Sequence, residues 1–202
     1  MPRAAGQIDV AKNEAILDAA AVVLSMLGVS APMAEIARRA GVSKQTIYNH
    51  YGSKAELVQA LCARRVEEMT QGLTMPDAGL HPEAALAIYA RGLLRVVTEQ
   101  DGAAFLRMAI SAVDTLPDVA RAFFEAGPRT SRAQLAEFLR IETEAGRLSC
   151  PDPLEAAEFF GGMVLGSYQT AALLGVDRGL DEAGIDRIVS EAAMRFLKAY
   201  AA

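Results

Sequence analysis

The sequence predicts an all-α protein of about nine or ten helices. Apolar residues recur three and four positions apart through nearly every segment, and no stretch alternates with period two for long enough to indicate a strand. Glycine and proline residues interrupt this pattern at intervals that suit helices of ordinary length. Beyond the fourth helix, the predicted helices cover residues 82–99, 102–113, 117–126, 128–145, 153–174 and 181–200.

Local start and stop signals define the helices of the N-terminal part. The first helix runs from about residue 10 to residue 27 and ends at Gly28. Pro32 suits the first turn of the second helix, because that turn does not need its amide hydrogen. The segment "SKAE" fits a capping box in which Ser53 and Glu56 open a long fourth helix.

Bulk composition excludes several classes of protein. The chain has 202 residues, a net charge of -5 and no uninterrupted apolar run of about 18 residues, which a membrane-spanning helix needs. Its first residues lack the pattern of a signal peptide, so we expect a cytoplasmic protein without a membrane partner. Cys62 and Cys150 lie in no metal-binding spacing. We expect no metal or cofactor, and either two buried thiols or a redox-sensing one.

Charge is distributed unevenly along the chain. Residues 1–65 hold eight Lys/Arg and five Asp/Glu, whereas the remaining residues hold 12 and 20, so the first part carries +3 and the rest -8. A basic module on an acidic body is typical of a DNA-binding protein with a separate second domain, since DNA phosphates attract local positive charge.

The segment "MAEIARRAGVSKQTIYNHYGSK" predicts a helix-turn-helix. Gly41 can adopt a positive φ and reverse the chain, and Ser43 can cap the short third helix. Ile47 and Val42 point toward the domain core, so the other side chains form an outer surface that can enter the major groove. The alternative is a polar helix that only caps a bundle. The predicted DNA-contacting set is Lys44, Gln45, Thr46, Tyr48, Asn49, His50, Tyr51 and Lys54.

These residue types suit different parts of the double helix. Gln45 suits an adenine or a mixed base edge, Lys44 suits guanine or a phosphate, and Thr46 suits a phosphate or a thymine methyl group. His50 and the Tyr48 hydroxyl suit phosphate oxygens.

The segment 16–61, with its pattern "IA..AGVS..T.Y.HY.SK..L", resembles the DNA-binding domain of tetracycline-repressor-like (TetR/AcrR) transcriptional regulators. The segment 127–166 resembles the AefR-like type of C-terminal domain in that family. Family members usually carry Ser or Thr where this chain has Ala31 and Pro32. Ser30 is then the candidate cap of the second helix, and the loss of one phosphate contact predicts modestly weaker DNA binding.

The resemblance implies a DNA-binding domain at residues 1–55, joined rigidly to a ligand-binding and dimerisation domain at residues 56–202. It further implies a homodimer formed through the last two helices. The segment "LEAAEFFGGMVLGSYQTAALLG" is apolar nearly all round, which favours a dimer over the alternative of a helix buried in a monomer. The expected interface residues are Phe159, Gly162, Gly166, Thr170, Leu173, Ile188, Ala192 and Phe196.

The resemblance also implies a cavity for a small hydrophobic effector. Aromatic side chains and adaptable methionines are suitable walls, although a plain packed core explains the same residues. Arg107, in an otherwise apolar helix, has two interpretations: a partner for an anionic ligand or half of a structural ion pair. The candidate lining residues are Tyr89, Phe105, Met108, Phe123, Phe124, Met163 and Tyr168.

The predicted function is a ligand-responsive repressor that binds a palindromic operator in double-stranded DNA as a homodimer and is released by the effector. The alternatives are an activator, or a helical small-molecule-binding module without effector-driven release from DNA. An enzyme is not expected, because neither His50 nor His81 lies in a nucleophile motif and no phosphate-binding loop or metal spacing is present.

Overall fold

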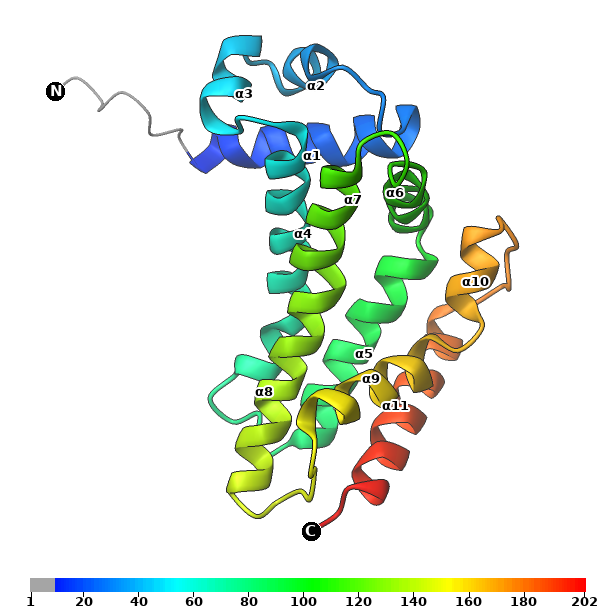
Figure 1. The fold of residues 1–202 in the computed structure, drawn as a ribbon. Coiled ribbons are helices and arrows are strands. Elements are labelled where there is room, and N and C mark those ends of the chain that lie inside the picture. Colours follow the sequence, from blue (N-terminus) through cyan, green and yellow to red (C-terminus); the bar gives the residue numbers. More distant parts are fainter. Residues whose placement is uncertain (1–9) are drawn as a thin grey trace, which may run out of the picture.

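The computed structural model describes residues 10–202 and is all-α in that part (Figure 1). The first nine residues, with Arg3 and the beginning of the expected 1–55 domain, lie outside the described residues. The described chain contains an isolated β-bridge, Leu148 to Ala201. Its α-helices are α1 (Val10–Leu27), α2 (Met33–Ala40), α3 (Lys44–His50), α4 (Lys54–Thr70), α5 (Pro82–Thr98), α6 (Gln100–Ser111), α7 (Pro117–Phe124), α8 (Thr130–Glu144), α9 (Pro153–Leu165), α10 (Tyr168–Leu173) and α11 (Glu182–Ala199).

The fold class is confirmed, and most predicted helices match within a residue or two. The first difference is at Gly127 and Pro128, where a break was predicted. Instead α7 and α8 continue into each other through a π-helical turn, Glu125–Arg129. A π turn widens the backbone around the proline, and the Thr130 hydroxyl donates to the Glu125 carbonyl at 2.7 Å. If α7, the π turn and α8 are counted as one continuous helix, ten separate α-helices are present among the described residues.

The second difference is in the predicted helix 153–174, which breaks at Gly166. There the backbone has φ 44° and ψ -129°, which a residue with a side chain rarely adopts, and α10 starts in a new direction. The prediction was wrong because apolar periodicity continues across the break.

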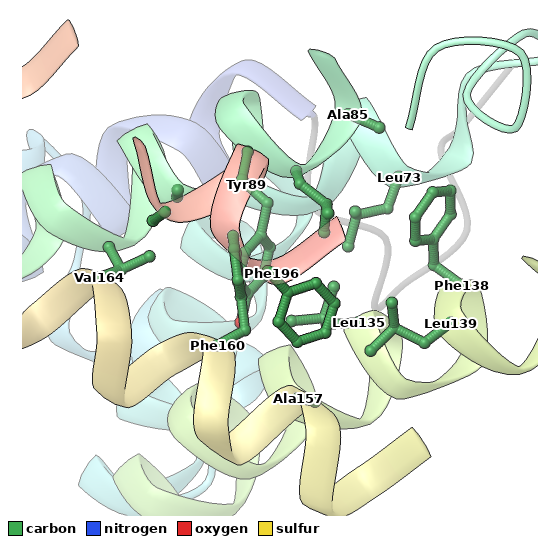
Figure 2. Packing of buried hydrophobic residues seen from close by; sticks show 14 of the residues in the cluster. Leu73, Ala85, Tyr89, Leu135, Phe138, Leu139, Ala157, Phe160, Val164 and Phe196 are labelled. Atoms are coloured by element: carbon green, nitrogen blue, oxygen red, sulfur yellow. The ribbon is translucent and has the colours of Figure 1, made fainter. Parts of the chain in front are cut away.

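Two hydrophobic clusters build the molecule. The first joins α1, α2 and α3 to the beginning of α4, and Phe105, Met108 and Val119 of α6 and α7 complete it. The second lies among α5, α8, α9 and α11. At its centre, Phe160 lies 6.2 Å from Tyr89 and 5.0 Å from Phe196 between ring centroids, as Figure 2 illustrates. Such contacts stabilise the core beyond the area they bury.

Helix α4 connects the two clusters without interruption (Figure 1). Its first half packs Leu57 and Leu61 into the first cluster, and its second half packs Val66 and Met69 into the second. Arg64 fixes the junction by donating to carboxylates of two α1 residues, Glu14 and Asp18, both at 2.8 Å. The N-terminal and C-terminal parts of the described chain are therefore joined through a continuous helix. No described helix is long and apolar enough to cross a membrane.

Candidate DNA-binding surface and ligand cavity

The turn between α2 and α3 follows from two residues. Gly41 has φ 67°, in the left-handed region, and the amide of Val42 donates to the Ala37 carbonyl at 3.0 Å. Ser43 caps α3, because its hydroxyl accepts from the Thr46 amide at 3.0 Å. The Thr46 hydroxyl also bonds to Ser43 Oγ at 2.8 Å, so the two side chains hold each other. Both the reversal at Gly41 and the cap at Ser43 are confirmed.

Helix α3 buries one residue, Ile47, and exposes the rest of its outer surface. Gln45 Nε2 donates to Asn49 Oδ1 at 2.6 Å, one helical turn away. That bond uses one hydrogen of Gln45 and the oxygen of Asn49, so the Gln45 oxygen and the Asn49 amide can still meet a base edge. The Lys44 ammonium lies 5.6 Å from the centroid of the Tyr48 ring. These four side chains form one polar surface, which we call the α3 surface: Lys44, Gln45, Tyr48 and Asn49.

The assignment of Tyr51 to the DNA-contacting set is corrected by its burial. The ring is only 6% exposed, and its hydroxyl donates to Asn13 Oδ1 on α1. His50 stays exposed, and its Nε2 shares the same oxygen at 3.1 Å. Burial raises the pKa of the Tyr51 hydroxyl. Tyr51 therefore fixes α3 on α1, whereas His50 remains accessible at the edge of the α3 surface.

Lys54 has a structural bond that the sequence did not indicate. Its ammonium donates to the carbonyl of Val29 in the α1–α2 loop, and burial lowers its pKa. The predicted capping box is present, since Ser53 Oγ accepts from the Glu56 amide at 3.1 Å and Glu56 accepts from the Gly52 amide at 3.0 Å. Two of the three ammonium hydrogens of Lys54 remain for a phosphate.

Helix α2 begins without a side-chain cap, so the expected cap at Ser30 is wrong. Pro32 occupies the capping position with extended backbone angles, and no side chain accepts from the first amides. Ala31 is 2% exposed and belongs to the first cluster, where a hydroxyl would need a buried partner. In the first turn of α2 the Glu35 amide donates to the Pro32 carbonyl at 3.0 Å, and no side chain caps the amides before it.

A cavity of about 120 Å³ lies where α4, α5, α6, α8 and α9 meet. Of the predicted lining residues, Tyr89, Phe105 and Phe123 line it. Met108 does not, because it is buried in the first cluster, and Phe124 and Met163 are 52% and 43% exposed on the surface. Tyr168 lies instead in a groove beside α10, where the guanidinium of Arg178 covers its ring at 4.5 Å.

Sequence reasoning missed most of the cavity walls. The second half of α4 contributes Cys62, Arg65 and Met69, whose spacing is the same as that of ordinary packing residues. Burial raises the pKa of Cys62 to about 12, so it is an unreactive thiol at neutral pH. The hydroxyls of Tyr89 and Ser131 bond to each other at 2.8 Å within the wall.

Arg107 forms neither of the contacts expected for it. It is exposed and donates to the carbonyl of Ala172 at 2.8 Å, which links α6 to α10. Its guanidinium is not part of the cavity.

The expected dimer residues divide into two groups. Phe159 is 57% exposed on α9, and Gly162, Gly166 and Thr170 are also exposed, while Leu173 and Ile188 are partly buried. Ala192 and Phe196 are corrected: they are 3% and 0% exposed and pack inside the second cluster of their own chain. Periodicity identified the apolar stripe of α11 but did not show whether it packs against the core of its own chain or against a partner subunit.

Comparison with known proteins agrees with this architecture. The family model of bacterial regulatory proteins of the tetR family matches residues 16–61, and that of the AefR-like transcriptional repressor C-terminal domain matches residues 84–202. The helix-turn-helix (HTH)-type transcriptional regulator SrpR of Pseudomonas putida is 40% identical over 69 residues, which cover 34% of this chain and 32% of SrpR. The chain thus spans about a third of that relative.

Solved structures match over nearly the whole chain. A protein of Mesorhizobium loti MAFF303099, described as a TetR-family transcriptional regulator, is 25% identical with a TM-score of 0.80, over 96% of this chain and 100% of that one. The flavonoid-responsive regulator FrrA is 32% identical with a TM-score of 0.70, over 94% and 97%. The chain therefore belongs to the tetR family of bacterial regulatory proteins, as a DNA-binding transcriptional regulator with an AefR-like C-terminal domain and not as an enzyme.

Proposed function

We propose that this regulator is a repressor that acts in the cytoplasm, binds a palindromic operator as a homodimer and leaves it when a small hydrophobic effector enters the cavity. In this proposal residues 1–55 read the DNA and residues 56–202 bind the effector and the partner subunit. The observation that carries the proposal is that one uninterrupted helix, α4, packs into the hydrophobic cluster that also holds Ile47 of α3 and, further along, lines the cavity.

The DNA-reading part of the proposal rests on the α3 surface. Its exposed side chains combine an amide pair, a lysine and a tyrosine hydroxyl, which are groups that contact base edges and phosphates. Helix α3 is short and depends on its cap at Ser43 and on packing of Ile47 for its position. The side chains of such a helix are already positioned in the free protein, so less conformational entropy is lost when the operator binds, which favours tight binding.

The release part of the proposal rests on the position of α4 between the two clusters. Lys54, in its first turn, holds the α1–α2 loop, and eight residues later Cys62 lines the cavity. A ligand that displaces the second half of α4 moves the first half as well, because a helix without a break transmits a tilt. Two recognition helices fit successive major grooves only when they are about 34–36 Å apart, so a tilt lowers affinity.

The homodimer part rests on the exposed apolar surface of α9. Phe159 and Met163, one helical turn apart on α9, are 57% and 43% exposed. Exposed apolar patches of this kind mark interaction surfaces. FrrA is by name responsive to flavonoids, which supports an aromatic effector for this chain as well.

Selection of bound sequences from a random DNA pool, at low and moderate salt, tests the proposal. We expect a palindrome whose half-sites lie about one helical turn apart. The logarithm of affinity should fall steeply with the logarithm of salt concentration, because phosphate contacts release counterions. Enrichment of a single half-site would contradict the dimer, and an operator complex that no hydrophobic compound dissociates would favour the activator or effector-independent alternative.

Two matched variants test the α3 surface on the selected operator. Gln45→Ala should relax the base preference at one position by about 1–3 kcal/mol while leaving binding to random DNA unchanged. Tyr48→Phe removes one hydroxyl and should weaken binding to all sequences by about 3- to 10-fold, as one lost hydrogen bond implies. Fluorescence anisotropy measures both. Wild-type binding by both variants would show that another surface reads the DNA.

A further inference from the structure

Arg65 is the one arginine lining the cavity for which the described structure provides no acceptor. It lies on α4, is partly buried and makes no ion pair and no hydrogen bond with any described residue. Its guanidinium lies over the ring of Phe105, 5.0 Å from the centroid, and Phe105 is 1% exposed. The cation is thus held at the cavity wall by an aromatic ring and not by a carboxylate.

Neighbouring charges do not provide the missing partner. The other cavity arginine, Arg132, pairs with Glu158 at 2.9 Å, and Arg64, the residue before Arg65, pairs with two α1 carboxylates. Glu68 and Asp101 attract Arg65, but both are exposed and neither reaches within the 4.0 Å of an ion pair. Burial lowers the pKa of Arg65, yet a guanidinium remains protonated at neutral pH.

A partly buried guanidinium that is not paired with a carboxylate has lost some of its hydration, and an anion that entered the cavity would compensate for that cost. A guanidinium binds a carboxylate through two parallel hydrogen bonds, which is a strong and directional contact. An aryl carboxylate would bring its ring against the apolar wall at the same time. The Tyr89 and Ser131 hydroxyls, 2.8 Å apart, offer a second polar contact within that wall.

The volume limits the size of the occupant. A cavity of about 150 Å³ in another protein is large enough for benzene, and this one measures about 120 Å³. Gly127 and Gly161 line it without side chains, and the half-buried Phe123 lies at its wall. The cavity is thus slightly smaller than one that holds benzene, so one ring is the upper limit and a long acyl chain does not fit.

We propose that the effector is a small organic acid with one ring, whose carboxylate binds Arg65 and whose ring packs near Phe105. This inference rests on the proposed function, in which the cavity is the effector site. It adds a negative charge to the hydrophobic effector that the sequence indicated, and it assigns the partner of that charge to Arg65 and not to Arg107.

Calorimetry on the full chain tests the charge directly with matched probes. Benzoate, 4-hydroxybenzoate, phenylacetate and cinnamate are each compared with the corresponding amide, which has nearly the same shape and no charge. We expect at least one acid to bind at least 10-fold more tightly than its amide. Equal binding of every pair, or binding by no acid, overturns the inference.

Arg65→Met tests the residue, because methionine keeps an unbranched apolar stem but no charge. The preference for acid over amide should fall to about onefold, while amide binding stays unchanged. The ligand-free variant should melt at the same or a higher temperature, since a partly buried cation without an ion-pair partner has been removed. Arg121→Met, at an exposed arginine of α7, is the control and should keep the preference. A preference that survives in Arg65→Met overturns the assignment.

Release of the selected operator separates this inference from the proposed function. If neutral hydrophobic compounds release DNA and acids do not, the effector site stands and the acid inference fails. If acids bind through Arg65 without changing operator affinity, the acid inference stands and effector-driven release fails.

Discussion

Two glycines meet different requirements. Gly41 in the helix-turn-helix is needed for a backbone conformation that residues with a side chain rarely adopt, whereas Gly102 in the cavity wall is needed because there is no room for a side chain. Gly41 has φ +67°, and a Cβ added there meets no atom within 4 Å. Gly102, near the start of α6, lies in ordinary helix, and a Cβ there would come within 1.8 Å of the Val96 carbonyl oxygen. The first requirement is local and visible in the sequence around the turn. The second depends on how α5 and α6 meet.

Gly102→Ala should have the largest effect among substitutions that test this comparison. The clash is with backbone, which cannot rotate away, so α6 must separate from α5. We expect the free energy of unfolding to fall by about 3 kcal/mol or more, a drop of about 6–12 °C in melting temperature for a chain of this size. Urea and thermal unfolding measure it. A loss below about 1 kcal/mol in unfolding free energy would mean that the α5–α6 junction accommodates the extra methyl group with little strain.

Gly41→Ala should have a smaller effect, because only the backbone angle is strained. We expect a loss of about 1 kcal/mol in unfolding free energy. Gly41→Asn is the matched comparison, since asparagine tolerates positive φ better than alanine and should lose less. An asparagine variant as unstable as the alanine variant would point to lost space and would contradict the open surroundings of this glycine.

The same contrast explains how much of the fold followed from the sequence. The turn, the cap at Ser43 and the capping box at Ser53 are signals within a few residues, and all three are present in the structure. In the C-terminal part, Pro128 reads as a break but is accommodated by a π turn, and the apolar run through Gly166 hides a real break. Those outcomes depend on neighbouring helices, which periodicity alone does not describe.

The candidate sites divide in the same way. Exposed polar residues on a short capped helix were predictable, because nothing else in the sequence requires them there. The corrected residue in that set, Tyr51, is buried in the first cluster and donates to Asn13 of α1, a contact 38 positions away along the chain. The cavity was predicted only in part, since aromatic residues that line a space and those that fill it have the same spacing. Arg65 had no local signal at all.

Gly161→Ala should change the free energy of unfolding least among these substitutions, and it should raise that free energy where the others lower it. Gly161 lies within α9, is buried, lines the cavity, and a Cβ added there meets no atom within 4 Å. Alanine also favours a helix over glycine, so we expect a gain of about 0.5–1 kcal/mol in unfolding free energy. Gly161→Met should extend further into the cavity. It should reduce affinity for the acid probes at least 10-fold. If both variants lose stability instead, the space beside Gly161 is closed by packing and is not part of an open ligand site.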